Sequence, residues 1–146
     1  MTQEDIQNKN LVLITYLDSI IQGYKVKAEY STNDNDLKVI VCQEESGSKV
    51  VFYDNDNPLF NYYMINVYGD NIKDEKETSV LIGNLIGQSI KVEYIVKKGT
   101  KEKPVYETQT WQIIFMQMTN PRAIQYMDIR RIAYTMTLKC IVNRVA

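Results

Sequence analysis

Residues 60–87 read FNYYMINVYGDNIKDEKETSVLIGNLIG, and in this stretch a strand pattern passes directly into a helix pattern. The strand part, Phe60–Tyr68, carries apolar side chains on both faces, which is typical of a strand that is central in a sheet or completed by a partner chain. After Gly69-Asp70-Asn71, a helix is predicted from about Lys73 to Gln88, because acidic residues gather in its first turns, where the helix dipole favours them. The side chains expected to face the sheet are Val80, Leu81 and Leu85, with Ile82 and Ile86 as further candidates.

Patterns of the same two kinds extend on both sides of this unit. Thr2 to Gln22 carries apolar residues at helical spacing and is followed by Gly23, which predicts an amphipathic helix that ends there. Elsewhere apolar and polar residues alternate with a period of two, as in half-buried strands. The predicted strands cover residues 24–30, 37–42, 50–53, 60–68, 90–96, 105–118 and 132–142.

The connections complete the predicted architecture. Short polar turns join the first strands, which predicts an antiparallel meander. Lys97–Pro104 is expected to form a charged hairpin tip, Asn120-Pro121 to break the strand ladder, and a parity shift near Arg130 and Arg131 to mark a bulge. The fold class is therefore α+β: an antiparallel or mixed sheet of about seven strands, with an N-terminal helix and a second helix packed on it. No linker-like stretch divides residues 1–146, so a single domain is predicted.

The composition is that of an ordinary folded protein, with 45% hydrophobic and 24% charged residues. The 11 tyrosines favour strands and contact surfaces, because the ring packs while its hydroxyl stays hydrated. The polar, acidic start MTQEDIQNKN lacks the features of a signal peptide, and no apolar run approaches the length of a membrane span. We therefore expect a soluble, intracellular protein with no membrane partner.

Charge is divided unevenly along the chain. Residues 1–73 hold six Lys/Arg against eleven Asp/Glu, a net charge of −5, whereas residues 74–146 hold eleven against seven, a net charge of +4. Chance variation in surface charge is one interpretation. The other is a protein with complementary faces that stack head to tail into a ring.

The residues that usually carry catalysis are missing from the sequence. There is no histidine, which removes the commonest general base and the commonest transition-metal ligand together. Cys42 and Cys140 have no CxxC spacing and lie in apolar strand patterns, so buried free thiols are expected in preference to a disulfide. No GxSxG motif occurs, and GNLIG lacks the following Lys-Ser/Thr of a phosphate loop. The sequence predicts neither an enzyme nor a cofactor.

Two acidic stretches resemble the start of calcium-binding loops: Asp34-Asn35-Asp36 and Asp54-Asn55-Asp56. A calcium loop starting at Asp34 places Glu45 at its twelfth position, which is the right residue. Its sixth position is Val39, however, where the sharp turn of such a loop requires glycine. Solvated turns are therefore favoured over metal sites.

Two further patterns leave alternatives open. Ser79, Gly83 and Gly87 form a stripe of small residues on the second helix, which allows close packing either inside the chain or against a neighbouring subunit. The C-terminal part is basic, but no nucleic-acid-binding module accompanies it. Pairing with acidic residues of the same chain or of a neighbour is favoured, and lining of a pore that DNA traverses is the alternative. The basic residues are Arg122, Arg130, Arg131, Lys139 and Arg144.

The order of these segments resembles the tail terminators and related neck proteins of long-tailed phages and of prophage-derived tail particles of Gram-positive bacteria. The resemblance lies in an N-terminal helix, a meander, the strand-to-helix unit at residues 60–87, and a final long strand within WQIIFMQMTNPRAIQYMDIRRIAYTMTLKCIV, residues 111–142. It covers most of the chain and includes no catalytic motif.

The resemblance implies a small α+β protein located in the virion tail or neck and assembled in the host cytoplasm. In that family, subunits form a hexameric ring that caps the tail tube, ends tail polymerisation and joins the tail to the head connector. The implied partners are further copies of the chain and tube, sheath or connector proteins, with DNA at most passing through the ring lumen. Alternatives are another phage head-completion or tube-like structural protein, or a monomeric ligand-binding α+β domain.

Three segments are expected to form the contacts of such a ring. They are the acidic 54–57 loop, the 97–103 hairpin and the basic 122–131 region. The residues expected to make these contacts are Asp54, Asp56, Lys97, Lys98, Lys101, Lys103, Arg122, Arg130 and Arg131. Reversing the charges of Arg130 and Arg131 together is expected to impair assembly and to leave the fold intact.

Overall fold

The computed structural model describes residues 3–35, 37–44, 61–126 and 131–146 and shows an α+β fold, as the sequence predicts. Its elements, in chain order, are α1 (Gln3–Ile20), β1 (Lys25–Lys27), the short 3-10 turn η1 (Thr32–Asp34), β2 (Val39–Glu44), β3 (Asn61–Tyr68), α2 (Ile72–Gly83), β4 (Ser89–Gly99), β5 (Pro104–Met118), β6 (Arg122–Tyr126) and β7 (Arg131–Arg144). Within these residues the seven strands form one mixed sheet in the order β1-β2-β3-β7-β5-β4, and β6 pairs with β7 beside that path.

Strand β3 occupies the middle of the sheet. It pairs antiparallel with β2 on one edge and with β7 on the other. Tyr63, Ile65 and Val67 enter the main core on one face, while Tyr68 packs with Val39 on the opposite face. Phe60–Tyr68 was predicted to be central or completed by a partner chain. The described part, Asn61–Tyr68, is central, since β2 and β7 pair with its two edges, and Tyr62 and Met64 stay half-buried.

Strand β7 pairs with three other strands, β3, β5 and β6. Residues 134–140 pair with β3, while the other edge of β7 pairs with β5 and then with β6. The predicted break at Asn120-Pro121 separates β5 from β6, which sequence periodicity did not identify as a strand. The register between β5 and β7 shifts at Phe115/Gln117, so the bulge in the described chain lies there. Arg130, part of the predicted bulge, lies outside the described residues.

The prediction of an antiparallel meander at the start of the sheet is wrong. Strand β1 runs parallel to β2, with Lys25 opposite Val39 and Lys27 opposite Val41. The segment between them includes η1 and returns the chain to the beginning of β1, so the second strand starts beside the start of the first. A crossover replaces the expected hairpin turn. The predicted strand at 50–53 lies outside the described residues.

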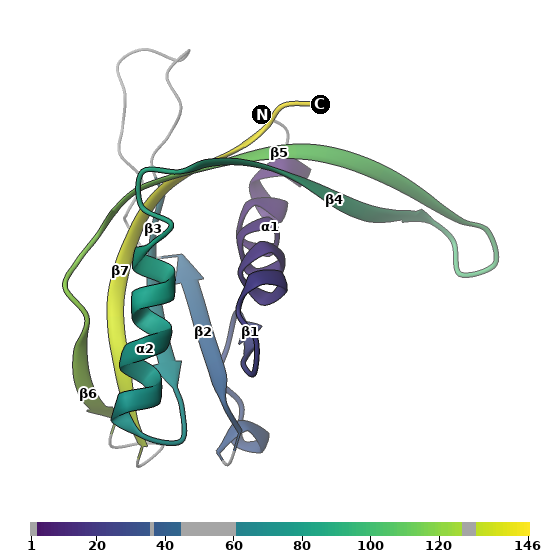
Figure 1. Ribbon diagram of the computed structural model, residues 1–146. Helices are drawn as coiled ribbons and strands as arrows, with labels where there is room; N and C mark the ends of the chain where they lie inside the picture. Colours follow the sequence, from purple (N-terminus) through teal and green to yellow (C-terminus); the bar gives the residue numbers. More distant parts are fainter. Residues whose placement is uncertain (1–2, 36, 45–60, 127–130) are drawn as a thin grey trace.

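The sheet curls, and both helices lie on its concave side (Figure 1). Leu13 and Leu17 of α1 are fully buried against the sheet, together with Trp111 and Phe115 of β5. The alternation predicted for the long strands holds, since Ile113 and Leu138 also point into this core. The remaining core members include Val26, Ile40, Cys42, Tyr63, Ile65, Met136, Cys140 and Val142.

Helix α2 is turned differently from the prediction. Val80 and Leu81, which were expected to face the sheet, are 56% and 55% exposed. The buried side chains of the helix are Glu75, Thr78, Ser79 and Ile82, and Leu85 is buried just beyond its end. Small hydroxyl side chains let the helix approach the sheet closely, because each bonds a carbonyl of its own helix: Thr78 to Asp74 and Ser79 to Lys76.

Candidate interaction surfaces

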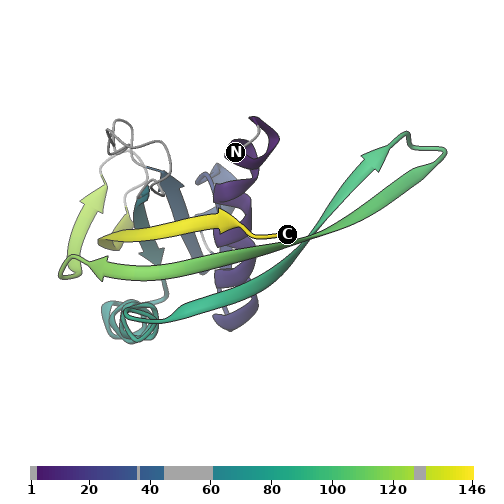
Figure 2. The ribbon, with the colours of Figure 1, turned by 90° about the horizontal axis from the view of Figure 1, so that it is seen from above.

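The ends of β4 and β5 leave the body of the protein as a projecting two-stranded arm (Figures 1 and 2). We define the arm as residues 94–109. The two strands stay paired out to Gly99 and Pro104. Strand β5 pairs with β7 only from Trp111 onward, so the arm has no third strand beside it within the described chain. At its root, Trp111 Nε1 donates to Oε1 of the buried Gln109 at 3.0 Å.

Large apolar side chains are exposed on both faces of the arm. Ile95 and Tyr106 are 63% and 64% exposed on the outer face, where their cross-strand partners place them diagonally opposite each other. Val105 is 58% exposed on the face that continues the core, diagonally opposite Val96. Sequence reasoning missed these residues. The signal was present, because Ile95 and Tyr106 are apolar residues at positions that the strand alternation assigns to solvent.

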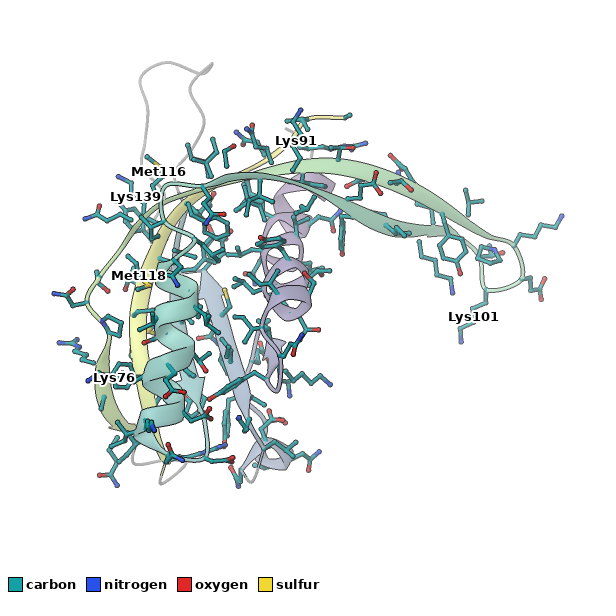
Figure 3. All side chains as sticks on the ribbon, in the orientation of Figure 1. Lys76, Lys91, Lys101, Met116, Met118 and Lys139 are labelled. Atoms are coloured by element: carbon teal, nitrogen blue, oxygen red, sulfur yellow. The ribbon has the colours of Figure 1, made fainter. Side chains whose placement is uncertain are left out.

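The predicted lysine cluster lies at the end of this arm. Lys97, Lys101 and Lys103 are exposed, and Lys101 lies at the tip (Figure 3). Lys98 is different, because its Nζ lies 2.5 Å from a carboxylate oxygen of Glu107 in its own chain. Lys98, and then Arg144, hold the pKa of the Glu107 carboxyl below its usual value. The structure therefore brings four of the nine predicted contact residues together, all of them exposed and one of them, Lys98, paired within its own chain.

Arg131 is bound by its own chain. Its guanidinium donates to the carbonyl oxygens of Asp34 at 2.7 Å and Leu37 at 2.6 Å, and to the Tyr30 hydroxyl at 3.2 Å. The same group lies 5.5 Å from the centre of the Tyr68 ring. Arg131 thus joins the start of β7 to the crossover between β1 and β2. The expectation that reversing its charge leaves the fold intact disagrees with this arrangement.

The other predicted contact residues are separate from the arm. Arg122 is exposed at the start of β6, beside a hollow of about 300 Å³ where β5 ends. That hollow is lined by Thr119, Asn120, Arg122, Thr135, Met136 and Thr137. Arg130, Asp54 and Asp56 lie outside the described residues, so the structure places neither the second half of the arginine pair nor the acidic loop.

A second hollow lies between α1 and the free edge of β4. Its volume is about 250 Å³. Helix α1 contributes Val12, Thr15, Tyr16 and Ser19, and β4 contributes Val92, Glu93 and Tyr94. Because β4 is the last strand of the sheet in the described chain, its outer backbone groups border this hollow without a strand partner. Burial raises the pKa of the Tyr16 hydroxyl.

Asp34, considered as a calcium ligand, is a structural residue. The prediction of a solvated turn is wrong for its side chain, which is buried. Its carboxylate accepts from Lys27 Nζ at 2.7 Å and from the Ser31 backbone N–H at 2.9 Å. The Lys27 contact is the largest of the effects that lower the pKa of Asp34. Within the described ranges, no three His, Cys, Asp or Glu side chains gather as a metal site would require.

The small-residue stripe on α2 packs inside the chain. Ser79 is buried, and a Cβ placed on Gly83 would lie 3.1 Å from Met118 Cε. Gly87 adopts a φ of +89° in the turn that follows the helix and has nothing near its missing Cβ. Internal packing, one of the two alternatives, therefore holds for Ser79 and Gly83.

The two cysteines are buried and free, as predicted. Burial raises the pKa of both thiols. In the part of the chain that the structure describes, no helix combines the length and apolarity needed to cross a bilayer.

Comparison with known proteins adds nothing to these observations, since the sequence matches no family model and no curated protein.

Proposed function

We propose that this protein is a structural subunit of a phage tail neck, which forms a hexameric ring that caps the tail tube and joins the tail to the head connector. The observation that favours an assembling protein is the arm. An isolated two-stranded ribbon is marginally stable in water, and this one exposes Ile95, Val105 and Tyr106. Surfaces of this kind on a small protein are typical of contacts with another chain.

The fold adds a second line of support. Among the described residues, the buried core cluster contains no side chain of the arm, and Tyr94 at the base of the arm packs against that cluster. Helix α2 lies far from the arm and also exposes two adjacent apolar residues, Val80 and Leu81 (Figure 1). Exposed apolar residues on two separate elements are typical of a protein that contacts other chains.

The test is deletion of the encoding gene in the phage or prophage that carries it. Loss of a tail terminator should yield overlong tails, or tails that fail to join heads, in electron micrographs. Normal free tails beside unjoined heads would instead indicate a head-completion protein and overturn the terminator assignment. Restoring the gene from a plasmid provides the control.

Mass in solution gives an independent check of the assembling role. The purified chain, alone or mixed with tail tubes, should elute as an oligomer or associate with the tubes. A strictly monomeric chain that binds no tail particle would contradict the proposal and favour a monomeric binding domain.

A further inference from the structure

We infer that the arm of one copy of this chain docks into the hollow between α1 and β4 of a second copy. The inference rests on the proposed ring and names the contact that would build it. The two surfaces are different parts of the same chain, so the contact is head to tail and leaves one arm and one hollow unused in any pair of copies. Further copies then add until the ring closes.

The arm has the properties of the inserted element. Its two apolar diagonals, Ile95–Tyr106 and Val96–Val105, lie on opposite faces, and contact with a second chain buries apolar surface that the described chain leaves exposed. Its free edge along residues 104–109 offers backbone groups that no strand of the described chain pairs. The tip carries the exposed Lys97, Lys101 and Lys103.

The hollow has the complementary properties. One wall is the apolar and hydroxyl-bearing face of α1, and the other is the free edge of β4. A groove between a helix and an unpaired strand edge is a setting in which an added strand is held by main-chain hydrogen bonds. Its volume of about 250 Å³ lies below the range of roughly 300–1,000 Å³ typical of small-molecule pockets, and a few side chains of an added strand would fill it.

Charge selects this hollow over the other uncovered surface. Glu93 is the single charged residue among those lining the hollow. Beside the lining, Asp18 follows on α1, where its carboxylate accepts from the Val26 N–H, and Lys91 is exposed two residues before Glu93. The exposed side of α2 instead carries Lys73 and Lys76, the latter extending from the helix in Figure 3, against one exposed acid, Glu77. A lysine-rich tip is attracted to the first and repelled by the second.

The arm cannot dock into the hollow of its own chain. Val92 and Tyr94, which line the hollow, belong to the root of the same chain's arm. The arm extends from that root away from α1, so its tip points out of its own hollow (Figures 1 and 2). The occupant is therefore the arm of a second copy.

The experiment uses two variants of the full chain and a mixture of them. Ile95→Ser with Tyr106→Ser removes the outer apolar diagonal of the arm. Thr15→Arg fills the hollow and repels the lysines, at an exposed helix position where arginine is a good helix former. Val80→Ser with Leu81→Ser, on the exposed side of α2, is the matched control. Circular dichroism and thermal unfolding verify that each variant is folded.

Light scattering after size exclusion measures the mass of each sample at a concentration where the wild type is oligomeric. We expect the arm variant and the hollow variant to be monomeric, and the α2 control to keep the wild-type mass. An equimolar mixture of the two monomeric variants should form a dimer and nothing larger, because one intact arm and one intact hollow remain.

The outcomes separate the inference from the proposed function. An oligomeric wild type whose arm variant keeps the same mass overturns the docking inference and leaves the ring standing. Folded monomeric variants that fail to dimerise on mixing overturn the head-to-tail pairing. If the wild-type chain is monomeric both alone and when mixed with tail tubes, the proposed ring is contradicted as well.

Discussion

At the scale of single residues, the junction between β3 and α2 requires glycine at position 69, because the neighbouring side chains leave no room for a Cβ atom. A Cβ on Gly69 would lie closest to the Tyr24 hydroxyl, then 2.8 Å from Asp74 Oδ2 and 2.9 Å from Glu75 Cγ. Those groups are themselves fixed, because Asp74 Oδ2 accepts from the Tyr24 hydroxyl at 2.7 Å and pairs with Lys38 Nζ at 3.0 Å. The sequence marked Gly69 as the end of a strand, whereas the structure shows that the reason is close approach.

Gly69→Ala should lower the free energy of unfolding by about 1–3 kcal/mol, the usual range for overpacking a closely packed site. Urea unfolding followed by tryptophan fluorescence measures the change. Gly83→Ala is the control, since its neighbour is the flexible end of Met118 and alanine favours the helix by about 1 kcal/mol. If Gly69→Ala is as stable as the wild type, the side chains around position 69 can move to accept a Cβ, and the predicted overpacking is contradicted.

Glu75 should make stability depend on pH. Burial raises the pKa of its carboxyl to about 7, while a backbone hydrogen bond from Gly69 and the charge of Arg131 act in the opposite direction. An unfolded chain releases this proton near pH 4.5, the ordinary value. Between these values the folded state alone keeps the proton, so stability falls as pH rises from about 4.5 to about 7 and is level on either side.

Glu75→Gln should remove that slope, which amounts to no more than about 1.4 kcal/mol per pH unit for one proton. Free energies of unfolding of the wild type and the variant, compared between about pH 4.5 and about pH 7.5, isolate the effect from other groups. Glu77→Gln, on the exposed side of the same helix, should retain the wild-type slope. Parallel curves for Glu75→Gln and the wild type would count against a buried, proton-holding carboxyl.

At the scale of elements, a few long-range contacts decide how the pieces meet. Helix α2 was predicted at nearly the right place, yet its apolar residues Val80 and Leu81 face outward. Periodicity identifies an apolar stripe but not whether the stripe meets the chain's own sheet or another surface. Likewise, β1 was recognised as a strand, but its parallel pairing depends on the crossover that Arg131 holds.

Arg131→Glu should therefore destabilise the fold, because the carbonyls of Asp34 and Leu37 lose their donor and the new charge is half-buried. We expect a loss of about 2–4 kcal/mol, the sum of lost charged hydrogen bonds and of the buried groups left unpaired. Arg122→Glu, at an exposed position, should change stability by less than about 0.5 kcal/mol. Denaturant unfolding midpoints of the two variants measure the difference. Equal midpoints for Arg131→Glu and Arg122→Glu would show that Arg131 does not stabilise the fold.

At the scale of the whole molecule, the arm is the feature that a sequence pattern describes least well. The strands of the arm and its charged tip were predicted at residues 90–96, 105–118 and 97–104, close to their observed bounds. Their projection away from the body was not, because a strand has the same periodicity whether it lies over a core or extends into solvent. The four predicted arm lysines thus proved to be neighbours on a projecting element, while Arg122 and Arg131 lie on other parts of the fold.

The sequence by itself determined the α+β class, the burial alternation of the long strands and the free thiols. These features follow from local spacing, since a period of two or of 3.6 decides which side chains leave water together. Only the tertiary structure decided the direction of β1, the outward face of α2, the burial of Asp34 and the freedom of the arm. Each of these depends on which distant segments meet, and no local period records that.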